Sequence, residues 1–223
     1  MTVCCHSVPT SGVAISTPPR PVLLAVYDTL ADWEFGLATA HINSAAHQTD
    51  PGRFTVVTVG LTDAPVRTMG GVRVVPDITV ADIDETATAA LILPGAQLFA
   101  DGYGTPWAEL AARLLDAGTP VAAICGATSA LARHGVLDRR AHTSNAAEYL
   151  DAQPGYRGAE FYVDDLAVTD GDLITASGIA PVHFARAVIE RLGLYRPETL
   201  DAWFDLYENH DPTAYPRLMA TPA

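Results

Sequence analysis

A short apolar run that ends on a cysteine is the part of the sequence best suited to chemistry. Val121 to Ile124 reads as a buried strand, Cys125 and Gly126 follow it, and helical spacing begins at Ala127. A side chain at such a turn faces the N-terminus of the next helix, where the helix dipole and free N–H groups favour an anion. The pattern predicts that Cys125 tends toward the nucleophilic thiolate. The alternative interpretation is a buried structural cysteine.

The sheet that would carry this cysteine is predicted by alternating strand and helix patterns. Apolar runs typical of buried parallel strands cover residues 22–27, 54–59, 89–93 and 121–124. Helical spacing covers residues 30–45, 107–117, 127–133 and 181–192, and hairpin signals lie at 66–75 and 166–175. Strands that alternate with helices predict an α/β fold with a mostly parallel sheet covered on both faces.

The carboxyl edge of this sheet is the expected site, because ligands of such folds bind beyond the carboxyl ends of the strands. Three strand ends would converge at this edge. Residues 28–34 follow the first strand, residues 94–96 follow the strand at 89–93, and Cys125 follows the strand at 121–124. Trp33 and Leu37 are four residues apart, so we expect them to mark the face of the first helix that packs on the sheet.

Three segments between these elements carry weaker patterns. Residues 76–83 show no clear period and are expected to form a crossing loop. Asn145 is a plausible N-cap for a short helix at 146–152. Residues 198–208 form an amphipathic helix with Leu200, Trp203, Phe204 and Tyr207 on one side.

The whole chain has the size and composition of one large α/β domain. It has 223 residues, of which 49% are apolar and 17% charged, and its formal net charge is −13. This charge argues against a nucleic acid or an anionic membrane as partner, because phosphate binding needs clustered Lys and Arg. No apolar run approaches a membrane span, and neither a Walker loop nor a G-x-G-x-x-G motif is present.

The three cysteines give no disulfide framework. Cys4 and Cys5 are adjacent near the start and lack the C-x-x-C spacing of a metal site, so we predict neither a metal nor a cofactor. A basic region followed by an apolar region is absent from the start, so no signal peptide is expected. A reducing cytoplasm fits these features best.

Together, several motifs resemble the ThiJ/PfpI superfamily of class I glutamine amidotransferase-like proteins, which includes the Parkinson-associated deglycase, PfpI-type proteases and isonitrile hydratases. The motifs are Leu91 to Gly95, Ala122 to Thr128 and the acidic residue of the first helix, with Leu173 to Gly178 as a further match. The resemblance covers roughly residues 21 to 194. It implies a flavodoxin-like three-layer sandwich with a cysteine nucleophile elbow, in proteins that are commonly dimers.

The resemblance assigns roles at matching positions. Cys125 matches the elbow cysteine, and Glu34 matches the acid that contacts its thiol, with Asp32 as the competitor if the register slips by two. A protonated acid there would donate a hydrogen bond to the thiolate. The backbone N–H groups of Gly95, Ala96 and Gly126 match positions that approach the substrate and would form an oxyanion hole.

One departure from the family pattern concerns histidine. Many members carry a histidine about twenty residues after the cysteine, and the aligned residue here is Asn145. His142 lies three residues earlier and is equally well read as a core or surface histidine. Gly126 stands where PfpI-like proteases have a histidine. These residues argue against a Cys-His protease pair.

Two functions of different class fit these residues. The first is a small-molecule hydrolase, hydratase or lyase, in which the Cys125 thiolate attacks an electrophilic carbon and Glu34 holds and later transfers a proton. The alternative is a sensor of redox or carbonyl stress without turnover, acting through oxidation of Cys125.

The chain is expected to divide into a flexible leader at 1–20, the α/β domain at 21–194 and a C-terminal helix and tail at 195–223. The C-terminal helix would pack either on its own domain or on a partner subunit, because large aromatic side chains are rarely left in water. A homodimer is the expected assembly, as the resemblance implies and as is commonest among oligomers.

Overall fold

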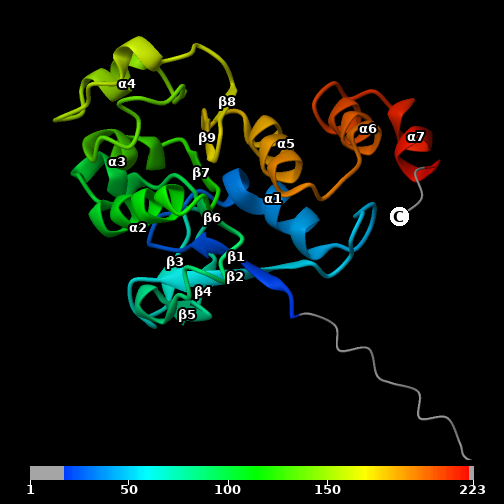
Figure 1. Cartoon of the computed structure of the whole chain (residues 1–223), viewed down its shortest axis with the longest axis horizontal. Coiled ribbons are helices and arrows are strands. Elements are labelled where there is room, and N and C mark those ends of the chain that lie inside the picture. Colours follow the sequence, from blue (N-terminus) through cyan, green and yellow to red (C-terminus); the bar gives the residue numbers. More distant parts are fainter. Residues whose placement is uncertain (1–17, 221–223) are drawn as a thin grey trace, which may run out of the picture.

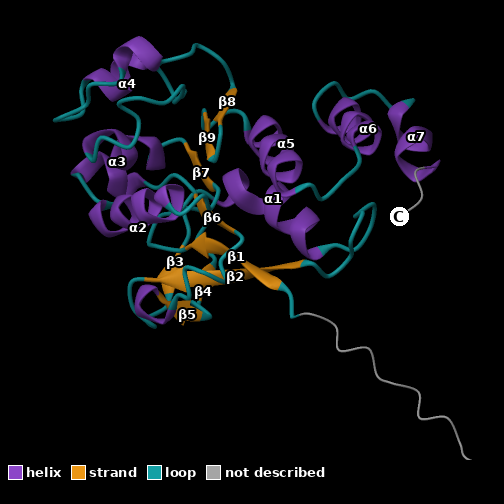
Figure 2. Cartoon of the chain, in the orientation of Figure 1, coloured by secondary structure: helices purple, strands orange, loops and turns teal. Residues whose placement is uncertain are grey.

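The computed structural model describes residues 18–220 and arranges their strands in one seven-stranded sheet and one two-stranded sheet (Figures 1 and 2). The order in the large sheet is β5-β2-β1-β6-β7-β9-β8, and every neighbouring pair is parallel except β8 and β9. The strands are β1 (Arg20–Ala25), β2 (Phe54–Gly60), β5 (Ile78–Thr79), β6 (Ala90–Leu93), β7 (Val121–Ile124), β8 (Ala167–Asp170) and β9 (Leu173–Ala176).

Helices cover both faces of the large sheet. Figure 1 shows α1 and α5 on one face and α2 and α3 on the other. Their bounds are α1 (Asp32–Asn43), α2 (Thr105–Asp116), α3 (Ala127–Arg133) and α5 (Pro181–Leu192), with a short α4 (Ala147–Asp151) beyond α3. The predicted α/β fold with a mostly parallel sheet is therefore confirmed. Both faces are covered because the central strands β6 and β7 are buried throughout and must be shielded from water on each side.

The two predicted hairpins are present. β3 (Val66–Arg67) pairs with β4 (Arg73–Val74) in the small antiparallel sheet, and β8 pairs with β9 at one edge of the large sheet. Residues 76–83, expected to be a loop, instead contain the edge strand β5 and a 3₁₀ turn at Val80–Asp82. A two-residue strand is too short to show alternation, so the sequence pattern missed it.

The face of α1 that packs inward differs from the prediction. Glu34, Ala38 and Ile42 are its buried residues, whereas Trp33 is 51% exposed and donates its indole N–H to the Gly178 carbonyl at 3.1 Å. Positions i, i+4 and i+8 share one helix face, so burial of the Glu34 carboxyl turns Trp33 outward. The prediction took the large apolar side chains Trp33 and Leu37 as markers of the packed face, whereas the row that begins at Glu34 is the buried one.

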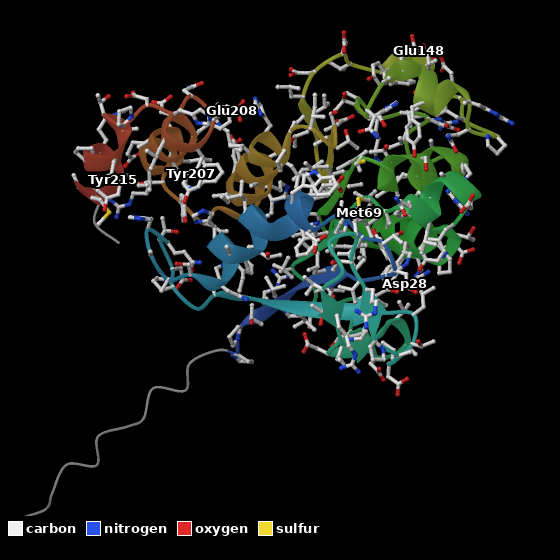
Figure 3. The ribbon with its side chains drawn as sticks, turned by 180° about the vertical axis from the view of Figure 1, so that it is seen from behind. Asp28, Met69, Glu148, Tyr207, Glu208 and Tyr215 are labelled. Carbon is white, nitrogen blue, oxygen red and sulfur yellow. The ribbon has the colours of Figure 1, made fainter. Side chains whose placement is uncertain are left out.

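The C-terminal segment forms two helices, α6 (Pro197–Tyr207) and α7 (Ala214–Ala220), of which only the first was predicted. Trp203 is fully buried and donates its indole N–H to His41 on α1 at 2.8 Å. Figure 3 shows Tyr207 and Tyr215 at the end of the molecule that lies away from Glu148 of α4. The apolar side of α6 thus packs on the chain's own domain.

The predicted leader falls largely outside the described residues, as do Cys4 and Cys5; Arg20 already belongs to β1. Within residues 18–220, no helix has both the length and the apolar character needed to cross a bilayer.

Candidate active site

Cys125 lies at the tight turn between β7 and α3. Its φ angle is +59°, a left-handed conformation that is uncommon for a residue other than glycine and costs about 1–3 kcal/mol. Two contacts hold the turn: the Cys125 N–H donates to the Ala176 carbonyl at 2.9 Å, and its carbonyl accepts the Thr128 hydroxyl at 2.6 Å. The surrounding structure therefore imposes a strained backbone that points this side chain at the carboxyl edge of the sheet.

The Glu34 carboxyl faces the Cys125 sulfur from the first turn of α1. Glu34 is buried, and its Oε2 accepts the Gly95 N–H at 2.5 Å. Its Oε1 is buried and receives no hydrogen bond from a described residue. Burial raises the pKa of Glu34 to about 7, against the opposing effect of the Gly95 N–H. An oxygen without a donor can carry this proton and present it to the sulfur.

Asn145 contacts the sulfur from another direction. Its Nδ2 donates to Cys125 Sγ at 3.3 Å, and its Oδ1 accepts the Gly178 N–H at 2.9 Å. The second bond fixes the orientation of the amide, so that a donor and not an acceptor faces the sulfur. Asn145 was expected to cap α4, but that helix has Ala146 at its N-cap because the Asn145 side chain is used at the cysteine.

The pKa of Cys125 moves in the direction opposite to the sequence-based expectation. Burial, and next the charge of the Glu34 carboxylate, raise the pKa of the thiol to about 11, while N–H donation by Asn145 and Gly126 opposes this. The sequence around the turn shows neither the burial of the thiol nor the Glu34 carboxylate, which belongs to helix α1. Cys125 and Glu34 therefore form one coupled pair that titrates together.

Two glycines press against this pair. A Cβ at Gly95 would lie 2.8 Å from Cys125 Cβ and 2.9 Å from Glu34 Oε2, and one at Gly178 would lie 2.7 Å from Cys125 Sγ. Only glycine permits backbone to approach this closely. Gly178 was in a motif that resembled the family, but no role was assigned to it; its steric demand appears only when β9 is placed beside β7.

Two further candidate residues, Asp32 and His142, lie away from the Cys125–Glu34 pair. Asp32 accepts the Gly70 N–H at 2.7 Å and so serves the β3–β4 hairpin. His142 is fully buried and bonds to the Arg140 carbonyl and the Tyr156 hydroxyl, each at 2.7 Å. Neither contacts the sulfur, so the core interpretation of His142 fits its position.

The expected oxyanion donors are only partly available. The Gly95 N–H is taken by Glu34, and the Gly126 N–H is directed at the Cys125 sulfur. No acceptor for the Ala96 N–H is found among residues 18–220. In that same range, no three His, Cys, Asp or Glu side chains gather in a way that would hold a metal ion.

Comparison with known proteins places the chain in a family. The model of the DJ-1/PfpI family matches residues 20–191. The chain is 38% identical over 204 residues to a Bacillus subtilis protein named uncharacterized protease YoaZ, covering 91% of this chain and 97% of that protein. It is 27% identical over 143 residues to the glutathione-independent glyoxalase DJR-1.2 of Caenorhabditis elegans, covering 63% of this chain and 75% of that one.

Solved structures show the same fold. A ThiJ/PfpI family protein from Bacillus anthracis superposes with a TM-score of 0.83 at 39% identity, covering 90% of this chain and 96% of that one. A DJ-1 superfamily protein from Agrobacterium tumefaciens superposes with a TM-score of 0.77 at 35% identity, covering 86% and 98%. With the family model matching most of its length, the chain belongs to the DJ-1/PfpI family.

Proposed function

We propose that this protein is an enzyme that acts on small carbonyl compounds by nucleophilic addition of Cys125, with Glu34 as its proton-transfer group. The observation that carries the proposal is the contact between the two side chains: a buried carboxyl with a pKa raised to about 7 faces a sulfur on a strained strand-to-helix turn. A group that titrates near neutral pH suits general acid–base catalysis. The turn then acts as a nucleophile elbow.

The first step adds the thiol across the carbonyl of a 2-oxoaldehyde. A C–S bond forms, the carbonyl π pair moves to oxygen, and the proton of the Cys125–Glu34 pair passes to that oxygen. The resulting hemithioacetal holds all atoms of both reactants. The developing negative charge would lie within reach of the Ala96 N–H, which has no acceptor among the described residues.

The second step moves a proton between neighbouring carbons. The Glu34 carboxylate takes the proton from the carbon bound to sulfur and returns it to the adjacent carbon. The hydroxyl proton moves from the first oxygen to the second in the same rearrangement, which gives a thioester of a 2-hydroxy acid. Water then hydrolyses the thioester and frees the thiol. The net reaction adds one water to the 2-oxoaldehyde and needs no oxidant or cofactor.

Peptide hydrolysis is less well supported by the side chains around Cys125. The sulfur is flanked by an amide at Asn145, which neither accepts nor transfers a proton, and His142 bonds elsewhere. The relatives carry names of both kinds, protease for YoaZ and glyoxalase for DJR-1.2. One proton-transfer group is enough for the glyoxalase-type reaction.

Turnover assays test the proposal. Purified protein is incubated with methylglyoxal, and lactate formation is followed, with Cys125→Ala and Glu34→Gln as inactive variants and casein as the protease substrate. Saturable lactate formation that both substitutions abolish supports the proposal. Casein cleavage without lactate formation contradicts it.

A sensor without turnover is the second candidate, favoured by the donors around the sulfur. N–H groups of Asn145 and Gly126 would stabilise an oxidised sulfur as well as a thiolate. This function predicts a single peroxide equivalent consumed at Cys125 and no lactate. We further propose that the protein works as a homodimer on a small-molecule substrate in the cytoplasm, whose reducing poise preserves the thiol.

A further inference from the structure

A hollow of about 290 Å³ opens next to the Cys125 centre. Asn145 belongs to both, since its Nδ2 donates to the sulfur and the residue also lines the hollow. Ser177, another lining residue, directly precedes Gly178, where a Cβ would lie 2.7 Å from the sulfur. The hollow and the Cys125 centre are therefore neighbours that share Asn145.

One wall of the hollow carries a hydroxyl without a partner. Ser177 is 7% exposed as a residue, and its side-chain oxygen forms no hydrogen bond with a described residue. That oxygen is not among the fully buried unpartnered atoms, so it is open to the hollow and not sealed from it. The Ser177 hydroxyl faces a space in which a donor or acceptor from outside the chain can reach it.

The rim of the hollow is acidic. Asp164 and Asp165 line it, both are exposed, and neither forms an ion pair with a described residue. Asp165 Oδ1 accepts the Leu166 N–H at 2.7 Å, which fixes this carboxylate at the rim. The Tyr162 ring forms a further part of the wall. Two carboxylates and an aromatic face are the groups that attract a cation.

We propose that this hollow is a subsite for an ammonium or guanidinium group carried by the carbonyl compound that Cys125 attacks. The substrate class is thus a small carbonyl compound with a cationic arm, and this statement of substrate rests on the proposed role of Cys125. The arm is held by the charges of Asp164 and Asp165, the Tyr162 face and a hydrogen bond to the Ser177 hydroxyl.

Binding is measured without any chemistry at the cysteine. The full chain, labelled with ¹⁵N, is titrated with N-ethylguanidinium and with the neutral isostere N-ethylurea. The expected result is saturable shifts of the Ser177 and Gly178 amides with the cation alone. The double variant Asp164→Asn, Asp165→Asn should weaken this binding about tenfold. A matched double variant, Asp50→Asn with Asp116→Asn, removes the same amount of charge at positions that precede the amino ends of β2 and β7. This control variant should leave the binding of the cation unchanged.

A reactivity assay links the subsite to the sulfur. Cationic 2-aminoethyl methanethiosulfonate and neutral methyl methanethiosulfonate are compared, and mass spectrometry isolates the Cys125 peptide from Cys4 and Cys5. The cationic-to-neutral rate ratio at Cys125 should fall several-fold in the Asp164, Asp165 variant and in Ser177→Ala, with the neutral rate retained. Equal ratios in all variants, or equal shifts with urea, overturn the subsite.

Failure of the subsite and failure of the proposed function give different results. Lactate formation from methylglyoxal without cation-specific shifts leaves the function standing and removes the subsite. Cation-specific shifts without turnover keep the subsite and remove the carbonyl chemistry.

Discussion

One proton shared by Glu34 and Cys125 determines what this site can do. When both groups are protonated the sulfur is a weak nucleophile, and when both are ionised two buried negative charges face each other. The reactive form is the one with a single proton, which the Glu34 carboxyl and the sulfur share. Because the pKa of Glu34 is raised to about 7, this singly protonated form appears near neutral pH.

Alkylation of Cys125 should therefore rise with an apparent pKa of about 7. The rate with iodoacetamide, followed by mass spectrometry, should increase through this pH and again as the pH approaches the raised pKa of the thiol, about 11. Glu34→Gln should remove the step near 7. Asp32→Asn, two residues away and bonded to Gly70, is the matched control and should keep it. A wild-type rate that rises only above about 8.5, as for an ordinary thiol, would contradict the shared-proton model.

The glycine at position 178 gives a steric prediction. Gly178→Ala would place a Cβ 2.7 Å from Cys125 Sγ, so we expect alkylation and turnover to fall at least about tenfold through displacement of the sulfur. Gly36→Ala is the control, because a Cβ there meets nothing within 4 Å and alanine favours the helix by about 0.5–1 kcal/mol. Unchanged alkylation in Gly178→Ala would show that the backbone at this position can move aside.

At the scale of elements, Trp203 of α6 bonds directly to α1. Trp203 is fully buried, donates to His41 and stacks on Tyr207. His41 must accept this bond at Nε2, so its ring is neutral, in agreement with the lowering of its pKa by burial. The same helix α1 carries Glu34 in its first turn, which connects the C-terminal helices to the site through one rigid element.

Removal of this side chain should be costly. Trp203→Ala is expected to lower the free energy of unfolding by about 3–5 kcal/mol, as for other buried aromatics, and Trp203→Phe by less because the ring volume is largely kept. Tyr215→Ala, at a side chain that is 54% exposed, should change it by less than about 0.5 kcal/mol. Urea denaturation measures all three. Equal effects of Trp203→Ala and Tyr215→Ala would mean that α6 is not part of the cooperative unit.

At the scale of the whole molecule, Glu34 links stability to pH. Its pKa is higher in the folded chain, about 7, than the ordinary 4.5, so the folded state holds this proton more tightly. The resulting stabilisation is complete below about pH 4.5 and is lost as the pH rises through 7, a total of about 3 kcal/mol. Glu34→Gln should be free of this loss. Denaturation midpoints of the two proteins should therefore diverge between pH 4.5 and 8; parallel curves would refute the linkage.

Exposed apolar side chains near the start of α1 suggest where two subunits would meet. Trp33, Met69 and Val72 are each more than two-fifths exposed, and Figure 3 shows Met69 beside α1. We expect light scattering to give a dimer that Val72→Asp converts to a monomer, since a buried unpaired charge is strongly unfavourable. Tyr207→Asp, at a side chain of α6 that is 39% exposed, should remain dimeric. A dimeric Val72→Asp variant together with a monomeric Tyr207→Asp variant would show that the interface lies at α6.

The fold and the position of the cysteine could be predicted because they depend on local pattern. Continuous apolar runs at 90–93 and 121–124 are sufficient to indicate buried parallel strands, and a strand followed at once by a helix places Cys125 at the turn between them. The first-turn acid Glu34 was identified by resemblance at its position.

The electrostatics of the site were decided only by the tertiary structure. Burial of Glu34 against the sulfur turns Trp33 outward, raises both pKa values and reverses the expected direction for Cys125. The side chain of Asn145 contacts the sulfur and does not cap α4. Its orientation is fixed by the N–H of Gly178, which follows β9. Each of these effects depends on distances between residues far apart in the chain. The sequence by itself determined which groups were available, and packing decided which of them share a proton.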